Sequence, residues 1–288
     1  MAIEKAGSRE AAIPAWIKRF YDKAAIWWGD ANRSPASLER YREYLEKFTG
    51  AGKKRILDLG GGTGQIAHCF ACLGHEVVSV ELSRAEYIRR RSAQVDGPGS
   101  LAVIEGNFLE AAIPGKFDVV CCWEVFGIGT DDNQKSLLKR IAGEWLAEGG
   151  TAIVEVYSPI GPIKYSGTER RLRALPGVPG SVDMVNRCSF DPVAAMWIDE
   201  WKPVAAPSEA LSQRIRCYTP ADFMRMLAGS GLRLVHAEYH GLKLETDGGA
   251  APNHEEASRN PLYDCEDDYA YVVKLAKDGA DNGRFSSP

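Results

Sequence analysis

A glycine-rich turn framed by two acids is the part of this sequence with the clearest chemical potential. Residues 58–64 read DLGGGTG, between a short apolar run and a helical pattern. The alternating glycines let the backbone turn sharply and approach a ligand closely. Asp58 opens this turn, and Glu81 ends the next apolar run. Because an acid placed like Glu81 can accept hydrogen bonds from both hydroxyls of an adenosine ribose, the pattern predicts a nucleoside site.

The spacing of the glycines distinguishes two nucleoside cofactors. The dinucleotide fingerprint GxGxxG, counted from Gly60, requires glycine where the sequence has Gln65. S-adenosylmethionine carries a ribose and an amino-acid tail but no pyrophosphate. The turn therefore favours S-adenosylmethionine over NAD.

Two further polar side chains stand at the ends of apolar runs. Glu124 follows Trp123 at the end of the run 116–124, where it could touch an acceptor as a base or as an anchor for an amine. The alternative, a carboxylate that caps a helix or forms an ion pair, is left equally open by the sequence. Tyr157 ends the run 149–157 and could either hydrogen-bond a substrate or pack under the segment that follows.

The elements that must position these residues alternate along the chain. Strands are predicted at 53–59, 75–83, 101–107, 116–124, 149–157, 232–241 and 269–277. Helices are predicted at 10–30, 36–48, 65–74, after an SRAE capping box at 83–86, at 130–148 and at 218–231. This alternation predicts an α/β fold, a doubly wound and mostly parallel seven-stranded sheet with helices on both faces. Its ligand site lies at the switch point between the first and fourth strands.

The alternation also divides the chain into five expected segments. They are an N-terminal helical cover (1–52), a cofactor-binding core (53–157), a substrate-lid insertion (158–217), the remainder of the core (218–277) and a disordered tail (278–288). The insertion is rich in proline, glycine and aromatic residues without a clear period, which predicts a loop-rich backbone. Its TERRLR run at 168–173 could neutralise an anionic substrate, but a solvated helix face is the more common meaning of such a run.

Composition narrows the possible partners. The 288 residues carry a formal charge of −4, which offers no general attraction to nucleic acid. No apolar run is long enough to predict a membrane span, and the N-terminus lacks the apolar core of a signal peptide, so we expect a cytoplasmic location. The seven cysteines show no disulfide-framework spacing. Cys69 and Cys72 fall within a predicted helix, so no metal is expected.

Taken in order, these motifs resemble the class I S-adenosylmethionine-dependent methyltransferases of the small-molecule type. The segments ILDLGGGTG, VVSVELS, EGNF and FDVVCCWEVFG carry the resemblance over about residues 54–157. It implies S-adenosylmethionine as cofactor, with S-adenosylhomocysteine as product. It also implies methylation of a small, aromatic or heterocyclic secondary metabolite at O, N or C, without a nucleic-acid or membrane partner.

The resemblance assigns roles to individual residues. Gly60 and Gly62 would face the cofactor, Asp58 would orient its amino group, and Glu81 would bind its ribose. Leu82, Asn107 and Phe108 would surround the adenine, and Trp123 and Glu124 would border the methyl group. Asn107 departs from the usual aspartate, which removes charge from that hydrogen bond.

The aromatic stretch FYDKAAIWWGD at 20–30 resembles the N-terminal helix that covers the cofactor in such enzymes. Tyr21 would approach the carboxylate or sulfonium end of the cofactor, where its ring can attract the cation. Trp28 shares a helix face with Tyr21, whereas Trp27 points about 100° away, so Trp28 is the predicted lid residue. The alternative is that all three rings only pack.

Three other functions remain open. The same cofactor fold could catalyse cyclisation, with or without methyl transfer, in natural-product biosynthesis. It could also serve as a non-catalytic S-adenosylmethionine-binding module, or as an NAD-dependent oxidoreductase. The oligomeric state is left open, with a homo-oligomer among the alternatives.

Overall fold

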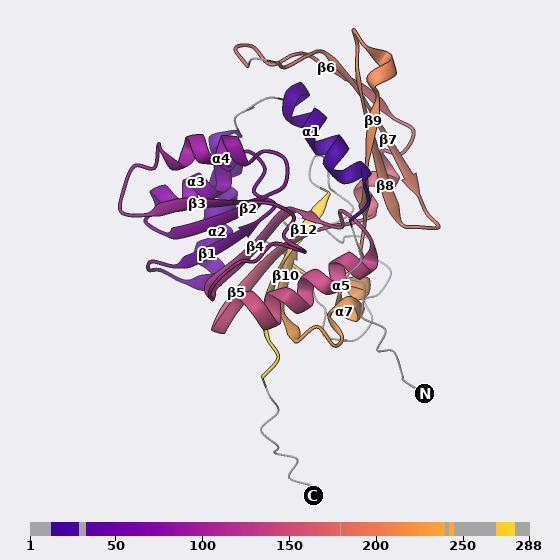
Figure 1. Ribbon diagram of the computed structural model, residues 1–288. Helices are drawn as coiled ribbons and strands as arrows, with labels where there is room; N and C mark the ends of the chain where they lie inside the picture. The colour runs from indigo at the N-terminus through magenta and orange to yellow at the C-terminus, as the bar shows by residue number, and fades with distance from the viewer. Residues whose placement is uncertain (1–12, 29–32, 179, 240–241, 245–268, 280–288) are drawn as a thin grey trace, which may run out of the picture.

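The computed structural model describes residues 13–28, 33–178, 180–239, 242–244 and 269–279 (Figure 1). Its main sheet has eight strands in the order β11-β10-β12-β5-β4-β1-β2-β3. Strands β1 to β5 pair in parallel, and β12 runs antiparallel to its neighbours β5 and β10. This confirms the predicted Rossmann-like fold, to which the short β11 adds an antiparallel edge. The strands are β1 (Arg55–Leu59), β2 (Glu76–Glu81), β3 (Ser100–Glu105), β4 (Phe117–Phe126), β5 (Leu146–Tyr157), β10 (Leu232–Tyr239), β11 (Leu242–Lys243) and β12 (Ala270–Lys277).

Helices cover both faces of this sheet, since the central strands are apolar on both sides. Helices α2, α3 and α4 pack on one face, with Phe70 and Ile88 in the cluster that holds Cys121. Helices α5 and α7 pack on the other face, with Leu137 and Phe223 in a second cluster. The helices are α2 (Pro35–Thr49), α3 (Gln65–Cys72), α4 (Ala85–Ser92), α5 (Asp131–Arg140), α6 (Ile160–Lys164) and α7 (Pro220–Leu227).

The starts of α7 and α4 differ in whether a side chain caps the helix. At α7, the Thr219 hydroxyl accepts from Asp222 N, and Asp222 Oδ2 accepts from Thr219 N, so a capping box begins this helix. The capping box predicted at 83–86 is wrong, because α4 begins at Ala85 without a side-chain cap. The Ser83 amide donates to Glu81 instead, and this contact competes with the helical start. The helix predicted at 130–148 also ends early, passing through a π-helix (Ile141–Trp145) into β5.

The insertion is more regular than its sequence predicted. Four antiparallel strands form a second sheet in the order β6-β7-β8-β9 (Figure 1). They are β6 (Glu169–Leu172), β7 (Met184–Asp191), β8 (Met196–Pro203) and β9 (Leu211–Arg216), and a 3₁₀ turn at Pro207–Glu209 precedes β9. Polar side chains at buried positions, such as Asn186 and Asp199, hide the apolar alternation that identifies strands.

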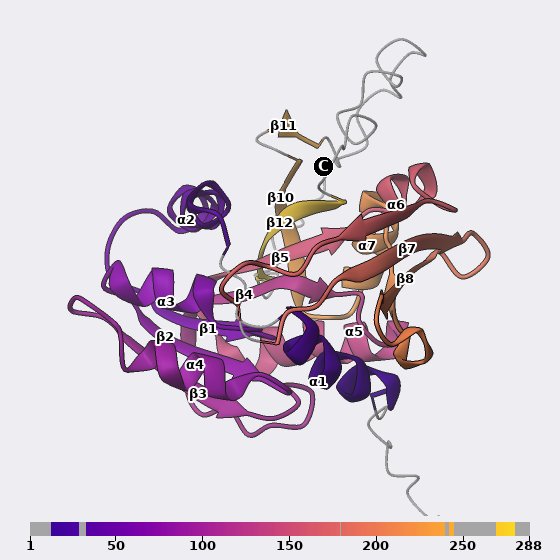
Figure 2. The ribbon, with the colours of Figure 1, turned by 90° about the horizontal axis from the view of Figure 1, so that it is seen from above.

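Helix α1 (Trp16–Trp28) lies beside the inserted sheet (Figure 1 and Figure 2). It is shorter than the predicted helix 10–30, whose first and last residues fall outside the described ones. Ile17, Phe20 and Trp27 are buried on its packed side. Helix α1, the inserted sheet and the main sheet together position the site. No helix among the described residues is long and apolar enough to span a membrane.

Candidate active site

A cavity of about 620 Å³ opens beyond the carboxyl ends of β1, β2, β4 and β5. Helix α1 and the inserted sheet contribute its other walls. Every site residue predicted from the sequence borders this one cavity: Tyr21, Trp28, Asp58, Gly60, Gly62, Glu81, Leu82, Asn107, Phe108, Trp123, Glu124 and Tyr157. The topology thus brings together residues spread over 137 positions, from 21 to 157.

Two features of the glycine turn favour glycine: the backbone conformation at Gly60 and Gly62, and the lack of space for a side chain at Gly60. Gly60 and Gly62 have φ values of 72° and 58°, in the left-handed region that favours glycine. A Cβ on Gly60 would lie 2.4 Å from Val125 Cγ2, whereas one on Gly62 would meet nothing within 4 Å. Gly60 therefore serves close packing against β4, and Gly62 leaves open space on the cavity side.

Glu81 holds this turn through its carboxylate. Its Oε2 accepts from Gly62 N and its Oε1 from Ser83 N, both at 2.8 Å. Burial raises the pKa of the carboxyl, and the two amides oppose that rise. The acid predicted to meet a ribose thus also holds the backbone of the glycine turn.

Asp58 and Asn107 are engaged locally. The Ser79 hydroxyl donates to Asp58 Oδ2 at 2.8 Å, and burial raises the pKa of Asp58 to about 6. Asn107 Oδ1 accepts from Leu109 N at 3.0 Å, and its Nδ2 donates to Glu110 at 3.0 Å. The Asn107 side chain therefore shapes the loop after β3.

Glu124 stands at an irregularity in β4. Between Cys122 and Phe126 the pairing with β5 shifts register, and Glu124 adopts φ 56°, which is rare for a residue other than glycine. A bulge of this kind re-aims a side chain, and here it directs the Glu124 carboxylate away from the sheet. The side chain is 42% exposed, and that exposure is toward the cavity.

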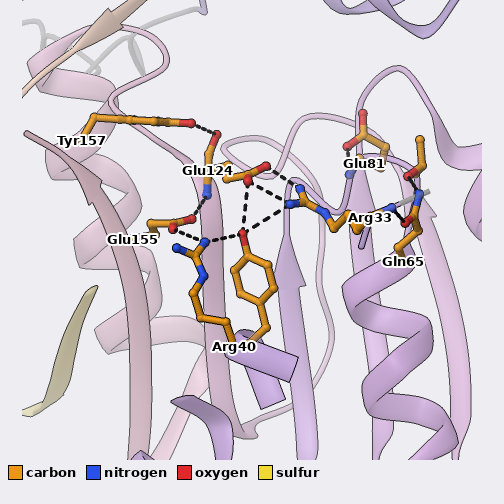
Figure 3. A network of polar contacts seen from close by, with 10 residues as sticks. Arg33, Arg40, Gln65, Glu81, Glu124, Glu155 and Tyr157 are labelled. Carbon is orange, nitrogen blue, oxygen red and sulfur yellow. Dashed lines mark hydrogen bonds and ion pairs between the residues drawn. The ribbon is translucent and has the colours of Figure 1, made fainter. Parts of the chain in front are cut away.

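The Glu124 carboxylate is paired (Figure 3). Arg33 Nη1 and Nη2 donate to Oε1 and Oε2 at 2.9 and 2.5 Å, and the Tyr41 hydroxyl donates to Oε1 at 3.1 Å. Burial raises the pKa of Glu124, but these hydrogen bonds and the arginine charge outweigh it and lower the pKa overall. Glu124 is therefore an ion-paired carboxylate that also borders the cavity, and its contact with an acceptor stays a prediction.

A second carboxylate, missed in the sequence, supports the first. Glu155 Oε2 accepts from the Glu124 backbone N–H at 2.9 Å, and Arg40 Nη2 donates to Glu155 Oε1 at 3.2 Å. Burial and the Glu124 charge raise the pKa of Glu155 to about 7. The sequence pattern places Glu155 within a strand but does not show which residue of the neighbouring strand it contacts. The pairing of β4 with β5 shows that this residue is Glu124.

Tyr157 packs under the segment that follows it and also borders the cavity. Its hydroxyl lies 3.4 Å from the Glu124 carbonyl oxygen, and burial raises its pKa. Its ring meets Trp197 edge-on, with centroids 5.6 Å apart. It therefore borders the cavity and packs under the inserted sheet at once.

The aromatic stretch of α1 joins the two sheets. The Tyr21 hydroxyl donates to Gln213 Oε1 in β9 at 2.8 Å. Trp28 meets Trp201 of β8 edge-on, with centroids 4.9 Å apart, and borders the cavity. Trp27 is buried, at 4% exposure, outside the residues that line the cavity. The structure thus places Trp28, and not Trp27, against the cavity, as the helix geometry predicted.

The inserted sheet contributes a polar cluster that the sequence did not reveal. Asp199 accepts from Asn186 Nδ2 at 2.6 Å, from Trp201 Nε1 at 2.5 Å and from Gln213 Nε2 at 2.7 Å. Trp197 and Trp201 alternate along β8 with Asp199 between them on the same face, and this polar residue hides the strand pattern in the sequence. The remaining cavity residues that sequence reasoning missed are Ile13, Ile17, Arg33, Gly61, Thr63, Gln65, Ile66, Arg84, Leu109, Val125, Ile128 and Arg170.

Comparison with protein families and curated sequences gives matches over part of the chain. Residues 30–237 match a family described as a methyltransferase domain. The ubiquinone biosynthesis O-methyltransferase of Azoarcus sp. (strain BH72) is 29% identical over 127 residues, covering 40% of this chain and 51% of that protein. Its counterpart from Vibrio cholerae is 32% identical over 120 residues, covering 39% and 48%. The chain spans about half the length of these curated relatives.

Solved structures share the fold over most of the chain. The CcbJ methyltransferase from Streptomyces caelestis has a TM-score of 0.65 at 21% identity, covering 91% of this chain and 96% of that one. The glycopeptide N-methyltransferase MtfA complexed with sinefungin has a TM-score of 0.52 at 19% identity, covering 86% and 99%. MtfA is also known with S-adenosylmethionine and S-adenosylhomocysteine bound.

Proposed function

This chain belongs to the methyltransferase-domain family, with S-adenosylmethionine as its cofactor, and on that premise we propose that it methylates a small aromatic or heterocyclic metabolite. The observation that carries the proposal is the cavity itself. Its glycine-turn side offers backbone and acidic groups, and its inserted-sheet side offers aromatic rings. A cavity of this size and mixed lining suits a cofactor beside a small acceptor.

The polar side of the cavity fits the cofactor. Gly62 leaves the space that a bound tail needs, and Glu81 is positioned to receive ribose hydroxyls. Asp58 would accept from the amino group, while Leu82, Asn107 and Phe108 would enclose the adenine. The bound sulfonium supplies an activated methyl group, so the chain itself has to provide mainly alignment and exclusion of water.

The aromatic side of the cavity fits the acceptor. Trp28, Trp197, Trp201 and Tyr157 present ring surfaces to the cavity from three different elements. Aromatic faces of this kind stack on planar ligands and exclude water from them. These walls favour an aromatic or heterocyclic body, such as a secondary metabolite provides.

Glu124 is best suited to anchor the acceptor. Its lowered pKa keeps the carboxylate ionised at neutral pH, which makes it a good hydrogen-bond acceptor but a weak base. It would receive a hydrogen bond from the acceptor's hydroxyl or amine, next to Trp123, and orient that atom for in-line attack. Both O- and N-methyltransferases occur among the similar proteins, so an acceptor assay has to include hydroxyl and amine compounds.

The deciding experiment combines binding and turnover. We expect calorimetry to show binding of S-adenosylhomocysteine, and labelled S-adenosylmethionine to yield a labelled product with some member of a panel of phenols, amines and carbon nucleophiles. Cofactor binding without labelled product from any acceptor would contradict methyl transfer and favour a non-catalytic binding module.

A further inference from the structure

Arg84 is a buried cation at the edge of the cavity. It directly precedes α4 and is 9% exposed. Its guanidinium carbon lies 5.2 Å from the ring centroid of Trp28 and 5.9 Å from that of Tyr21. Arg84 and both rings border the cavity. The cation is therefore enclosed between α1 and the end of β2, on the side where the inserted sheet meets α1.

This guanidinium lacks acceptors within the part of the chain that the structure describes. Arg84 Nε and Nη2 are buried without a hydrogen-bond partner, and so is the neighbouring Trp28 Nε1. Glu81 attracts the cation at longer range, and no hydrogen bond joins its carboxylate to the Arg84 guanidinium. Burial lowers the pKa of Arg84, although an arginine stays charged. A buried, unpaired cation is destabilising, which points to a partner beyond the described residues.

Other arginines that border the cavity already have partners. Arg33 forms the paired contact with Glu124, and Arg170 Nε donates to Asn186 Oδ1 at 2.9 Å. Arg84 and Trp28 instead offer unused N–H donors beside aromatic surface. A carboxylate suits this arrangement because it can accept two hydrogen bonds from one guanidinium.

We propose that Arg84, with Trp28, binds a carboxylate carried by the methyl acceptor, so that the substrate is an aromatic or heterocyclic acid. This rests on the proposed function. The carboxylate of the cofactor is the less suitable source, since it shares a carbon with the amino group assigned to Asp58 at the end of β1. Arg84 lies beyond β2, next to the ring that contacts Trp201.

The test uses the full chain saturated with S-adenosylhomocysteine and a pair of probes that differ in charge, benzoate and benzamide. We expect benzoate to bind at least about tenfold more tightly than benzamide by calorimetry, because charge-assisted hydrogen bonds are the stronger ones. Arg84→Gln should remove this preference and change the affinity for S-adenosylhomocysteine less than about twofold. Arg90→Gln, on the exposed face of α4, is the matched control and should keep the preference.

Thermal unfolding gives a second readout. Removal of an unpaired buried cation should leave the ligand-free Tm of Arg84→Gln equal or higher, whereas loss of a structural ion pair would lower it. Equal binding of the two probes by the unmodified chain would overturn the proposal, as would loss of S-adenosylhomocysteine binding in Arg84→Gln. Failure of the unmodified chain to bind S-adenosylhomocysteine at all would instead contradict the proposed function.

Discussion

The backbone amide of Glu124 donates a hydrogen bond to the carboxylate of Glu155 at 2.9 Å, across the neighbouring strands β4 and β5. The contact lies where the pairing of the two strands shifts register. It holds Glu124 in a left-handed conformation, with φ 56°, and aims its side chain at Arg33 and the cavity. Glu155 is therefore a positioning residue, and it acts through the backbone of the residue that we propose to meet the acceptor.

Glu155→Ala is expected to lower kcat about tenfold or more. Without Glu155 the Glu124 carboxylate shifts, and the acceptor atom is then poorly aligned with the methyl group. The affinity for S-adenosylhomocysteine should change less than about twofold. Glu155→Gln retains an acceptor for the Glu124 amide and should recover most of the activity. Steady-state kinetics with calorimetry check this, and full activity of the alanine variant would rule out a positioning role.

The same residue should leave a signature in the pH dependence of stability. The pKa of Glu155 is raised from 4.5 to about 7 in the folded chain, so the folded state binds the proton more tightly than the unfolded state. Its contribution to stability is present below pH 4.5 and is lost as the pH rises toward 7.

Denaturant unfolding between pH 4.5 and 8 checks this dependence. Glu155→Gln should flatten the fall in stability across that window, which is at most about 1.4 kcal/mol per pH unit for one proton. Asp58, whose pKa is raised to about 6, contributes with the same sign and should remain in the variant. Identical slopes for the two proteins would contradict the assignment.

Gly60→Ala and Gly62→Ala form a matched pair. Both force a left-handed conformation on alanine, at about 1–2 kcal/mol. Gly60→Ala also drives a methyl group to 2.4 Å from Val125, so it should destabilise the fold more than Gly62→Ala, which meets open space. Gly62→Ala should instead weaken S-adenosylhomocysteine binding about tenfold or more. Denaturant unfolding and calorimetry separate the two effects, and the reverse order of stabilities would be incompatible with this geometry.

Glu81→Ala should abolish measurable binding of S-adenosylhomocysteine while the chain stays folded. The structure adds a modest loss of stability, about 1–3 kcal/mol, since the amides of Gly62 and Ser83 lose their acceptor. Glu81→Gln keeps one acceptor oxygen and should be intermediate in both respects. Circular dichroism and calorimetry check this, and unchanged affinity in the alanine variant would exclude the ribose role.

Tyr21→Phe tests the connection between α1 and the inserted sheet. It removes the hydroxyl that donates to Gln213, at a net cost of about 1 kcal/mol. Amide exchange in α1 should accelerate, and acceptor KM should rise more than cofactor Kd. Tyr87→Phe is a suitable control, because the hydroxyl of Tyr87 also contacts α1 but its distance to the Ala25 carbonyl is long, at 3.4 Å. Equal exchange in the two variants would show that the hydroxyl does not hold the helix.

Local sequence patterns were sufficient to predict the elements of the main sheet and many of the residues that line the cavity. The alternation of apolar runs and helices, the glycine turn and the acid of Glu81 are all encoded within short windows. In such a fold the ends of parallel strands meet at one edge, so these residues had to converge. The prediction was wrong at the 83–86 capping box, because the Ser83 amide donates to the neighbouring Glu81 and α4 begins without a side-chain cap.

Only the tertiary structure decided which charges pair. The partnership of Arg33 with Glu124, the support from Glu155 and the unpaired state of Arg84 depend on contacts across elements. The order of the inserted sheet likewise depends on strands whose buried faces carry polar groups such as Asp199. Periodicity reports burial along one segment, whereas charge pairing depends on distances between segments. The sequence by itself therefore determined the fold and the glycine turn with its acid. The tertiary structure determined which charged side chains on the acceptor side of the cavity are paired.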